Sequence, residues 1–155
     1  MVSSAHAISN GLAADGGLFV PKEFPPISLA EIDAMREAPY SARALTVLAR
    51  FLTDYSEEEL RHCVETAYSK ERFGDFPAPL HLLKDNLDVL ELWHGPTCAF
   101  KDMALQILPL FLTKAVQKTG EQKKLVILVA TSGDTGKAAM AGFADVPETE
   151  VIVFY

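Results

Sequence analysis

The chain has 155 residues, of which 49% are hydrophobic and 23% are charged, and its formal net charge is -7 at pH 7. This composition predicts a packed core rather than a disordered chain, in one domain or in part of a larger enzyme. The negative charge argues against a nucleic acid or an anionic membrane as the partner, and the two cysteines lack the spacing of a metal site.

The first part of the chain, residues 1–79, is predicted to be a mainly helical domain. Ser3 is placed to cap a short helix that ends near Gly11, and a short strand is expected at 18–20. Further along, two serines each precede a glutamate by three residues, which is the capping-box spacing at a helix start. These pairs are Ser28 with Glu31 and Ser56 with Glu59, and the helices expected here cover 29–38, 41–52 and 57–71 before a linker at 73–79.

The second part, residues 80–155, has the pattern of an incomplete α/β domain. A buried strand is expected at 87–93, followed by a helix over 100–119 that Pro109 should bend, because the proline ring removes a backbone hydrogen bond. A strand at 123–131, a helix at 137–145 and a strand at 150–155 have the order and size of a βαβ unit. The predicted fold class is therefore α/β, with a mostly helical N-terminal unit before a partial parallel sheet.

Three further expectations concern the setting of the chain. The last strand is apolar and no covering helix follows it, so we expect part of a longer protein, with an unpaired sheet edge near Tyr155 that favours self-association. The longest apolar region, 103–116, is too short and too mixed in composition to span a bilayer. Unpaired thiols and the lack of a secretory signal pattern suit a cytoplasmic location.

Lys101 occupies an unusual place, between Phe100 and the start of the predicted helix. The positive end of a helix and burial beside an aromatic ring both disfavour the charged form of an amine. A lysine in its neutral form can act as a nucleophile or as a Schiff-base former. The alternative is a lysine that points into solvent, which local physics alone favours, while Asp102 suits the helix start.

The segment TSGDTGK, residues 131–137, joins a predicted buried strand to a helix, a place where exposed backbone N–H groups bind anions. The segment matches neither the phosphate-binding loop nor the dinucleotide-binding glycine pattern. The alternative is an ordinary turn with Asp134 as the N-cap of the helix. Both interpretations stay open for this segment taken alone.

His94 and Cys98 lie in the loop before Lys101 and could form a nucleophilic pair. We favour a loop histidine and a small buried thiol instead, because no third group that would orient the pair is present. Trp93, at the start of the same loop, is expected in the core.

Three segments taken together, SNGLAADGGLFVP, LWHGPTCAFKDMALQ and VATSGDTGKAA, resemble threonine synthase in order and spacing. That family consists of pyridoxal 5'-phosphate enzymes related to the tryptophan synthase β chain, and the resemblance covers nearly the whole chain. It implies that Lys101, the lysine of the H-G-P-T-x-A-F-K-D motif, forms the internal aldimine with the cofactor, with Phe100 packed against it. It further implies that the substrate carboxylate is bound by Thr131, Ser132, Gly133 and Thr135. Asp134 stands where related enzymes place an asparagine near the ring hydroxyl of the cofactor.

The implied reaction converts O-phospho-L-homoserine and water to L-threonine and phosphate, with Lys101 as the base and acid for protons at the substrate. Members of the family are much longer, so the resemblance implies an N-terminal portion with weak cofactor binding and little or no turnover. Two other functions remain as alternatives: a small phosphate- or nucleotide-binding α/β protein that uses residues 131–137, and a non-catalytic interaction module formed by residues 1–79. Neither accounts for Lys101 and its neighbours.

Overall fold

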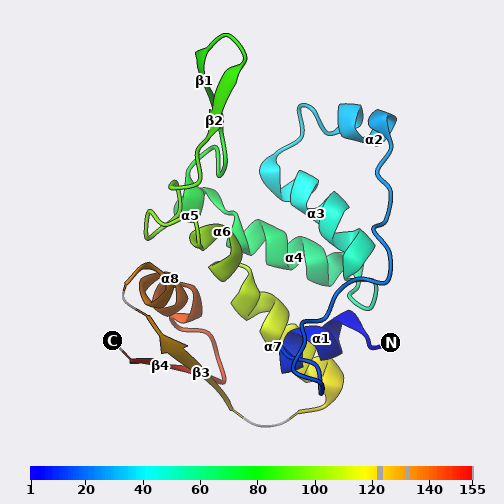
Figure 1. Cartoon of the computed structure of the whole chain (residues 1–155), viewed down its shortest axis with the longest axis vertical. Coiled ribbons are helices and arrows are strands. Elements are labelled where there is room, and N and C mark those ends of the chain that lie inside the picture. The colour runs from blue at the N-terminus through cyan, green and yellow to red at the C-terminus, as the bar shows by residue number, and fades with distance from the viewer. Residues whose placement is uncertain (122–123, 132, 155) are drawn as a thin grey trace. The chain divides into compact units, whose positions relative to one another are not determined.

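The structure, a computed structural model, describes residues 1–121, 124–131 and 133–154. The chain divides into two compact units (Figure 1): Met1–Glu65 with Phe111–Gln122, and Thr66–Leu110 with Lys123–Tyr155. Each unit combines segments that lie far apart in the sequence, because the divisions fall inside helices α4 (Glu57–Ala67) and α7 (Leu108–Thr119).

The first unit is helical, and its helix starts follow the capping signals in the sequence. Helix α1 (Ser4–Asn10) is capped by Ser3, whose hydroxyl accepts a hydrogen bond from the backbone N–H of His6 at 3.1 Å. The predicted strand at 18–20 is wrong, because this segment forms only a single bridge between Leu12 and Leu18 around a tight turn. Helices α2 (Leu29–Ala34) and α3 (Tyr40–Phe51) follow, and α2 is shorter than predicted.

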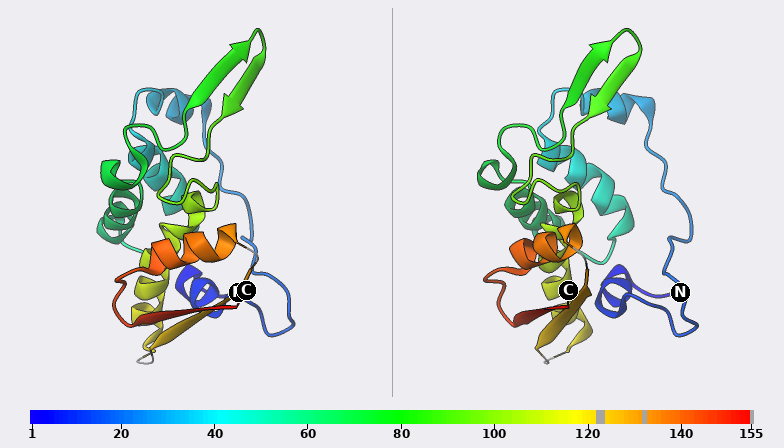
Figure 2. Two further views of the ribbon diagram at one scale, coloured as in Figure 1. Left: turned by 90° about the vertical axis from the view of Figure 1, so that its left-hand side faces the viewer. Right: turned by 60° about the vertical axis from the view of Figure 1, so that its left-hand side comes forward.

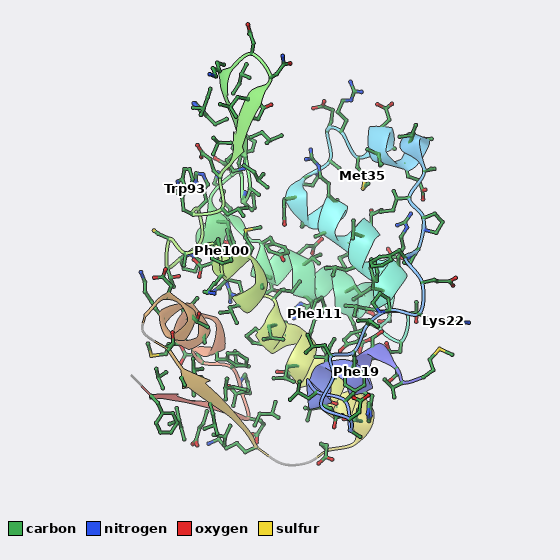
Figure 3. The ribbon with its side chains drawn as sticks, in the orientation of Figure 1. Phe19, Lys22, Met35, Trp93, Phe100 and Phe111 are labelled. Carbon is green, nitrogen blue, oxygen red and sulfur yellow. The ribbon has the colours of Figure 1, made fainter. Side chains whose placement is uncertain are left out.

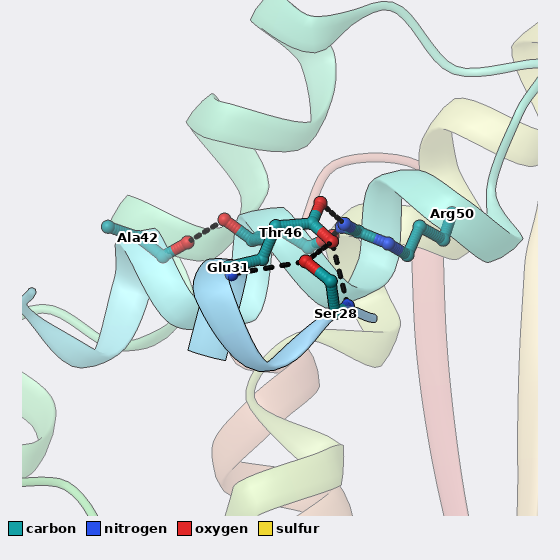
Figure 4. A network of polar contacts seen from close by, with 5 residues as sticks. All are labelled: Ser28, Glu31, Ala42, Thr46 and Arg50. Carbon is teal, nitrogen blue, oxygen red and sulfur yellow. Dashed lines mark hydrogen bonds and ion pairs between the residues drawn. The ribbon is translucent and has the colours of Figure 1, made fainter. Parts of the chain in front are cut away.

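Helices α2 and α3 are joined by a polar network (Figure 4). The Glu31 carboxylate accepts hydrogen bonds from the backbone N–H and the hydroxyl of Ser28, at 2.8 and 2.7 Å, so the predicted capping box is confirmed. The same carboxylate forms an ion pair with Arg50 of α3. The hydrogen bonds from Ser28, followed by the charge of Arg50, lower the pKa of Glu31.

The core of the first unit lies between the start of α4 and the part of α7 that belongs to this unit. Leu60 and Val64 are each 1% exposed, and Phe111 of α7 is also buried. Tyr55 packs its ring edge-on against Phe111 and donates its hydroxyl to the Phe111 carbonyl at 3.0 Å. The apolar spacing on each helix therefore provides a buried seam, as the helical period predicts.

The capping box at the start of α4 also carries an ion pair to α7. The Glu59 carboxylate accepts a hydrogen bond from the Ser56 backbone N–H at 2.8 Å and another from Lys118 Nζ, also at 2.8 Å. The hydrogen bond from Lys118, followed by that from the Ser56 backbone, lowers the pKa of Glu59 below its ordinary value of 4.5. A lowered pKa in the folded state means that the carboxylate stabilises the fold above the ordinary pKa, and that this contribution is lost as the pH falls.

We therefore expect Glu59→Gln to destabilise the chain near pH 7 by a small amount, of the order of 1 kcal/mol or less, because the pair is partly exposed to solvent. The difference in unfolding free energy between wild type and variant should shrink as the pH falls below 4.5, the ordinary pKa, and through the lowered pKa of the folded state, because Glu59 is then protonated in both states. Urea unfolding at a series of pH values measures this. The exposed Glu65→Gln variant is the control, and a difference that grows toward low pH would contradict the assignment.

The second unit begins with the short helix α5 (Lys70–Phe73) and an antiparallel hairpin of β1 (Leu80–Lys84) and β2 (Leu87–Leu90), seen as a narrow ribbon in Figure 2. The strand predicted at 87–93 is present as β2 only as far as Leu90, and its predicted burial is wrong, because most side chains of the hairpin are exposed. The missed signal was the Asp85–Asn86 pair between the two strands, where Asn86 has a φ of +60°, a left-handed conformation that asparagine tolerates in turns.

The predicted helix over 100–119 is divided. Helix α6 (Asp102–Leu105) ends before Gln106, and α7 starts at Leu108, so the expectation of one bent helix is wrong. Pro109 lies in the first turn of α7, where its missing N–H breaks no helical hydrogen bond. The proline therefore helps to start a second helix instead of bending the first.

The predicted βαβ unit is confirmed. Strands β3 (Leu125–Ala130) and β4 (Thr149–Phe154) are parallel and in register from Leu125 opposite Thr149 to Ala130 opposite Phe154. Helix α8 (Asp134–Phe143) connects the strands and packs on one face of this two-stranded sheet. The mixed α/β class is therefore confirmed. Within the described part of the chain, no helix combines the length and the apolar character needed to cross a bilayer.

Candidate functional site

Lys101 lies at the junction between the loop that follows β2 and helix α6, in the second unit. Its side chain is half-buried, and its Nζ lies 4.8 Å from the centroid of the Phe100 ring. Phe100, labelled in Figure 3, is 63% exposed, so the expected contact is present but the expected burial beside the ring is not. Helix α6, which follows Lys101, has only four residues. Few peptide dipoles are therefore aligned in it, and the positive potential expected at its N-terminus is weak.

The loop before Lys101 is held by a buried carboxylate. Asp102 is 0% exposed and accepts two hydrogen bonds from Thr97, one from its backbone N–H at 2.8 Å and one from its hydroxyl at 2.7 Å. Gly95 lies directly on this carboxylate, since a Cβ at Gly95 would be 2.5 Å from the Asp102 Cβ. The H-G-P-T segment is therefore built around Asp102, a role that a single sequence did not suggest.

The other notable side chains of this loop are those of Trp93, His94 and Cys98. His94 Nε2 lies 2.7 Å from a carboxylate oxygen of Glu91, and the His94 ring stacks on Trp93. Trp93, labelled in Figure 3, is 50% exposed and Cys98 is exposed, so the predictions of a core tryptophan and a buried Cys98 are wrong. The buried thiol is Cys63 in the first unit, where burial raises its pKa to about 11.

The turn between β3 and α8 carries the second group of predicted site residues. Thr131 continues the strand pairing, because its N–H donates to the Phe154 carbonyl at 3.1 Å, and its Oγ1 accepts from the N–H of Gly133 at 3.2 Å. Thr135 is half-buried and Asp134 is exposed. Ser132 lies outside the described residues, as does Tyr155.

The start of α8 differs from the prediction. The helix begins at Asp134 rather than at residue 137, and Gly133 is its N-cap, so the interpretation of Asp134 as the N-cap is wrong. Gly133 and its two chain neighbours apart, no atom of the described residues lies within 4 Å of the place where a Cβ of Gly133 would be. Gly133 therefore has open space beside it, although its own N–H is already donated to the Thr131 hydroxyl.

Helix α8 packs closely against both the strand and α6. A Cβ at Gly136 would lie 2.4 Å from the Cγ2 of Thr131, and a Cβ at Gly142 would lie 2.0 Å from the Leu105 carbonyl oxygen. These two glycines therefore bring the turn at 131–135 and the helix that follows Lys101 into one packed unit. No hydrogen bond or ion pair joins Lys101 to the turn among the described residues.

A buried polar contact lies beside the same helices. Arg72 donates from Nη1 to the Oε1 of Gln106 at 2.8 Å, and Gln106 is 2% exposed. Sequence reasoning did not identify this pair, because Gln106 was assigned to the interior of a long helix. A search of the described residues for three or more His, Cys, Asp or Glu side chains able to hold a metal ion finds no such group.

The chain is similar to known proteins of one family. A family model described as "Threonine synthase N terminus" matches residues 1–68. The threonine synthase of Schizosaccharomyces pombe is 38% identical over 99% of this chain, which covers 31% of that protein. The human threonine synthase-like 1 protein is 41% identical over 90% of this chain, which covers 19% of that protein.

The fold is also similar to that of a solved threonine synthase structure. The structure of threonine synthase from Brucella melitensis with bound PLP (pyridoxal phosphate) matches with a TM-score of 0.91 and 36% identity. The match covers 98% of this chain and 32% of that one. The chain thus spans about a third or less of the length of these relatives.

Proposed function

We propose that this chain is the N-terminal portion of a threonine synthase and that Lys101 is the residue that binds pyridoxal phosphate, an interpretation that its similarity to threonine synthases supports. The observation that carries the proposal is the position of the Lys101 amine. It is half-buried, it extends from a loop fixed around Asp102, and it lies 4.8 Å from the centre of an exposed aromatic ring. Phe100 can pack against the bound cofactor because most of its ring is exposed.

The donor set in this unit suits the cofactor. A primary amine is available at Lys101, and the turn between β3 and α8 carries the hydroxyls of Thr131 and Thr135 beside an open space at Gly133, whose own N–H is donated to Thr131 Oγ1. When bound, pyridoxal phosphate supplies an electron sink for carbanionic character at the substrate. We assign Thr131, Ser132, Gly133 and Thr135 to binding of the substrate carboxylate, and Asp134 to the region of the ring hydroxyl.

The proposed reaction is the conversion of O-phospho-L-homoserine and water to L-threonine and phosphate. Lys101 removes protons from the α and β carbons of the substrate, as a positioned general base. Phosphate leaves from the γ carbon, a proton is delivered to the γ carbon, water adds at the β carbon, and Lys101 as general acid returns a proton to the α carbon. Since the chain covers only 31% of the S. pombe relative, we propose that the remaining groups of the site come from residues equivalent to the rest of that protein, and that this chain alone has little or no turnover.

Further proposals concern the substrate class, the location, the domain division and self-association. We propose a small-molecule substrate, a cytoplasmic location and a division near residue 79 in the longer protein. Strands β3 and β4 pair only with each other among the described residues, so self-association through their edges stays a prediction. No contact among the described residues favours nucleotide binding or a non-catalytic interaction module.

Reductive trapping tests the proposal. The chain is incubated with pyridoxal phosphate and treated with borohydride, and the labelled lysines are identified by peptide mapping. We expect Lys101 to be labelled well above the exposed Lys84 of the same unit. Equal labelling of both lysines would contradict the assignment of Lys101. Threonine formation from phosphohomoserine at an ordinary enzyme rate would contradict the proposed inactivity of the chain alone.

A further inference from the structure

Asp102 is buried in an unusual way for a residue at the start of a helix. It is the first residue of α6, yet α6 has no side-chain cap hydrogen bond, and both Asp102 oxygens accept from Thr97 in the preceding loop. A buried carboxylate is costly unless hydrogen bonds satisfy it. The carboxylate therefore serves the loop rather than the helix.

The loop closes tightly around this carboxylate. A Cβ at Gly95 would lie 2.6 Å from the Oδ2 of Asp102, so a side chain at this position would displace the carboxylate. The N–H of Cys98 donates to the Gly95 carbonyl at 3.1 Å, and the N–H of Asp102 donates to the Ala99 carbonyl at 3.0 Å. Two successive turns thus lead from Gly95 to Asp102 with little freedom between them.

Lys101 lies inside this closed segment. Its carbonyl accepts hydrogen bonds from the N–H groups of Ala104 at 3.1 Å and Leu105 at 2.9 Å, and its φ and ψ are -63° and -21°. The backbone of Lys101 is therefore fixed from both sides, by Thr97, which precedes it in the loop and donates to the Asp102 carboxylate, and by α6, which follows it. A lysine side chain has many rotamers, so a fixed backbone at Lys101 limits the region in which its amine can lie.

We propose that Asp102, through its two hydrogen bonds with Thr97, is a positioning residue that directs the Lys101 amine toward an aldehyde ligand. The inference rests on the proposed role of Lys101 and extends it to two residues that do not themselves touch the ligand. It predicts that breaking the Asp102–Thr97 contact lowers the reactivity of Lys101 selectively, while other lysines keep theirs.

The test compares three variants by the ratio of pyridoxal phosphate label at Lys101 to label at Lys84 within the same molecule. Asp102→Asn keeps the size of the side chain, but its NH2 group cannot accept a hydrogen bond. Thr97→Val removes only the hydroxyl contact, and Thr97→Ser is the matched control that keeps both contacts. We expect the ratio to fall about tenfold for Thr97→Val and further for Asp102→Asn, and to stay unchanged for Thr97→Ser.

The outcomes separate the two proposals. A wild-type ratio near one contradicts the role of Lys101 itself. A high wild-type ratio that Thr97→Val and Asp102→Asn leave unchanged overturns the positioning role of Asp102 and leaves that of Lys101 intact. A lower Tm with an unchanged ratio means a purely structural contact and also overturns it. If Asp102→Asn fails to fold by circular dichroism, Thr97→Val decides the question.

Discussion

Replacing Lys101 with arginine is expected to remove the selective pyridoxal phosphate label, so that the total label on the chain falls in the trapping experiment and no other lysine takes its place. Arginine keeps the positive charge and can keep the contact with the Phe100 ring, which Lys101 makes at 4.8 Å from Nζ to the ring centroid. It stays protonated at any accessible pH and therefore cannot condense with an aldehyde. Peptide mapping after borohydride treatment measures the loss.

The matched control for this prediction is Lys137→Arg, in helix α8 of the same unit. Lys137 is exposed and its backbone N–H donates to the Gly133 carbonyl at 3.0 Å, a contact that arginine preserves. The control should therefore keep the label on Lys101. If Lys101→Arg retained its total label with only a change of site, or if Lys137→Arg lost the label equally, Lys101 would not be the residue that binds the cofactor.

The second large effect is expected for Gly142→Ala in helix α8. Within a helix this substitution ordinarily stabilises a protein by about 0.5–1 kcal/mol, because glycine loses more backbone entropy on folding. Here a Cβ would lie 2.0 Å from the carbonyl oxygen of Leu105, and a backbone atom cannot turn aside as a flexible side chain can. We expect a destabilisation of about 3 kcal/mol, which means that the usual sign is reversed.

Thermal unfolding checks this prediction, and we expect a Tm about 10 °C below that of the wild type for a chain of this size. Met140→Ala is the control in the same helix, because Met140 is 50% exposed and its removal should change the Tm by little. A Gly142→Ala protein as stable as the wild type would show that α8 does not pack on α6 as closely as the structure has it.

Local signals in the sequence identified many helix boundaries correctly. Ser3 caps α1, and the capping boxes Ser28–Glu31 and Ser56–Glu59 both form. These signals succeed because both partners of each hydrogen bond lie within three residues of each other. The apolar runs around residues 125–130 and 149–154 likewise identified the two parallel strands, but the predicted burial is wrong, because every second residue of both strands is exposed.

The errors occur where contact with a second segment decides the local structure. Leu80–Lys84 becomes a strand because it pairs with Leu87–Leu90, and neither segment alone has the alternation of a half-buried strand. The helix expected over 100–119 divides at Gln106, whose side chain is buried and accepts from Arg72. A pattern of spacing along one segment contains no information about such partners.

The same distinction applies to the candidate site. The sequence by itself singled out Lys101 and the turn at 131–135, because an amine before a helix and glycine with hydroxyl residues after a strand are recognisable in one dimension. Only the tertiary structure showed that Asp102 is buried under the loop at Gly95, and that Gly142 brings α8 onto α6. Burial and close backbone approach depend on which surfaces meet in space, and that is settled by the packing of the whole unit rather than by any residue's neighbours in the chain.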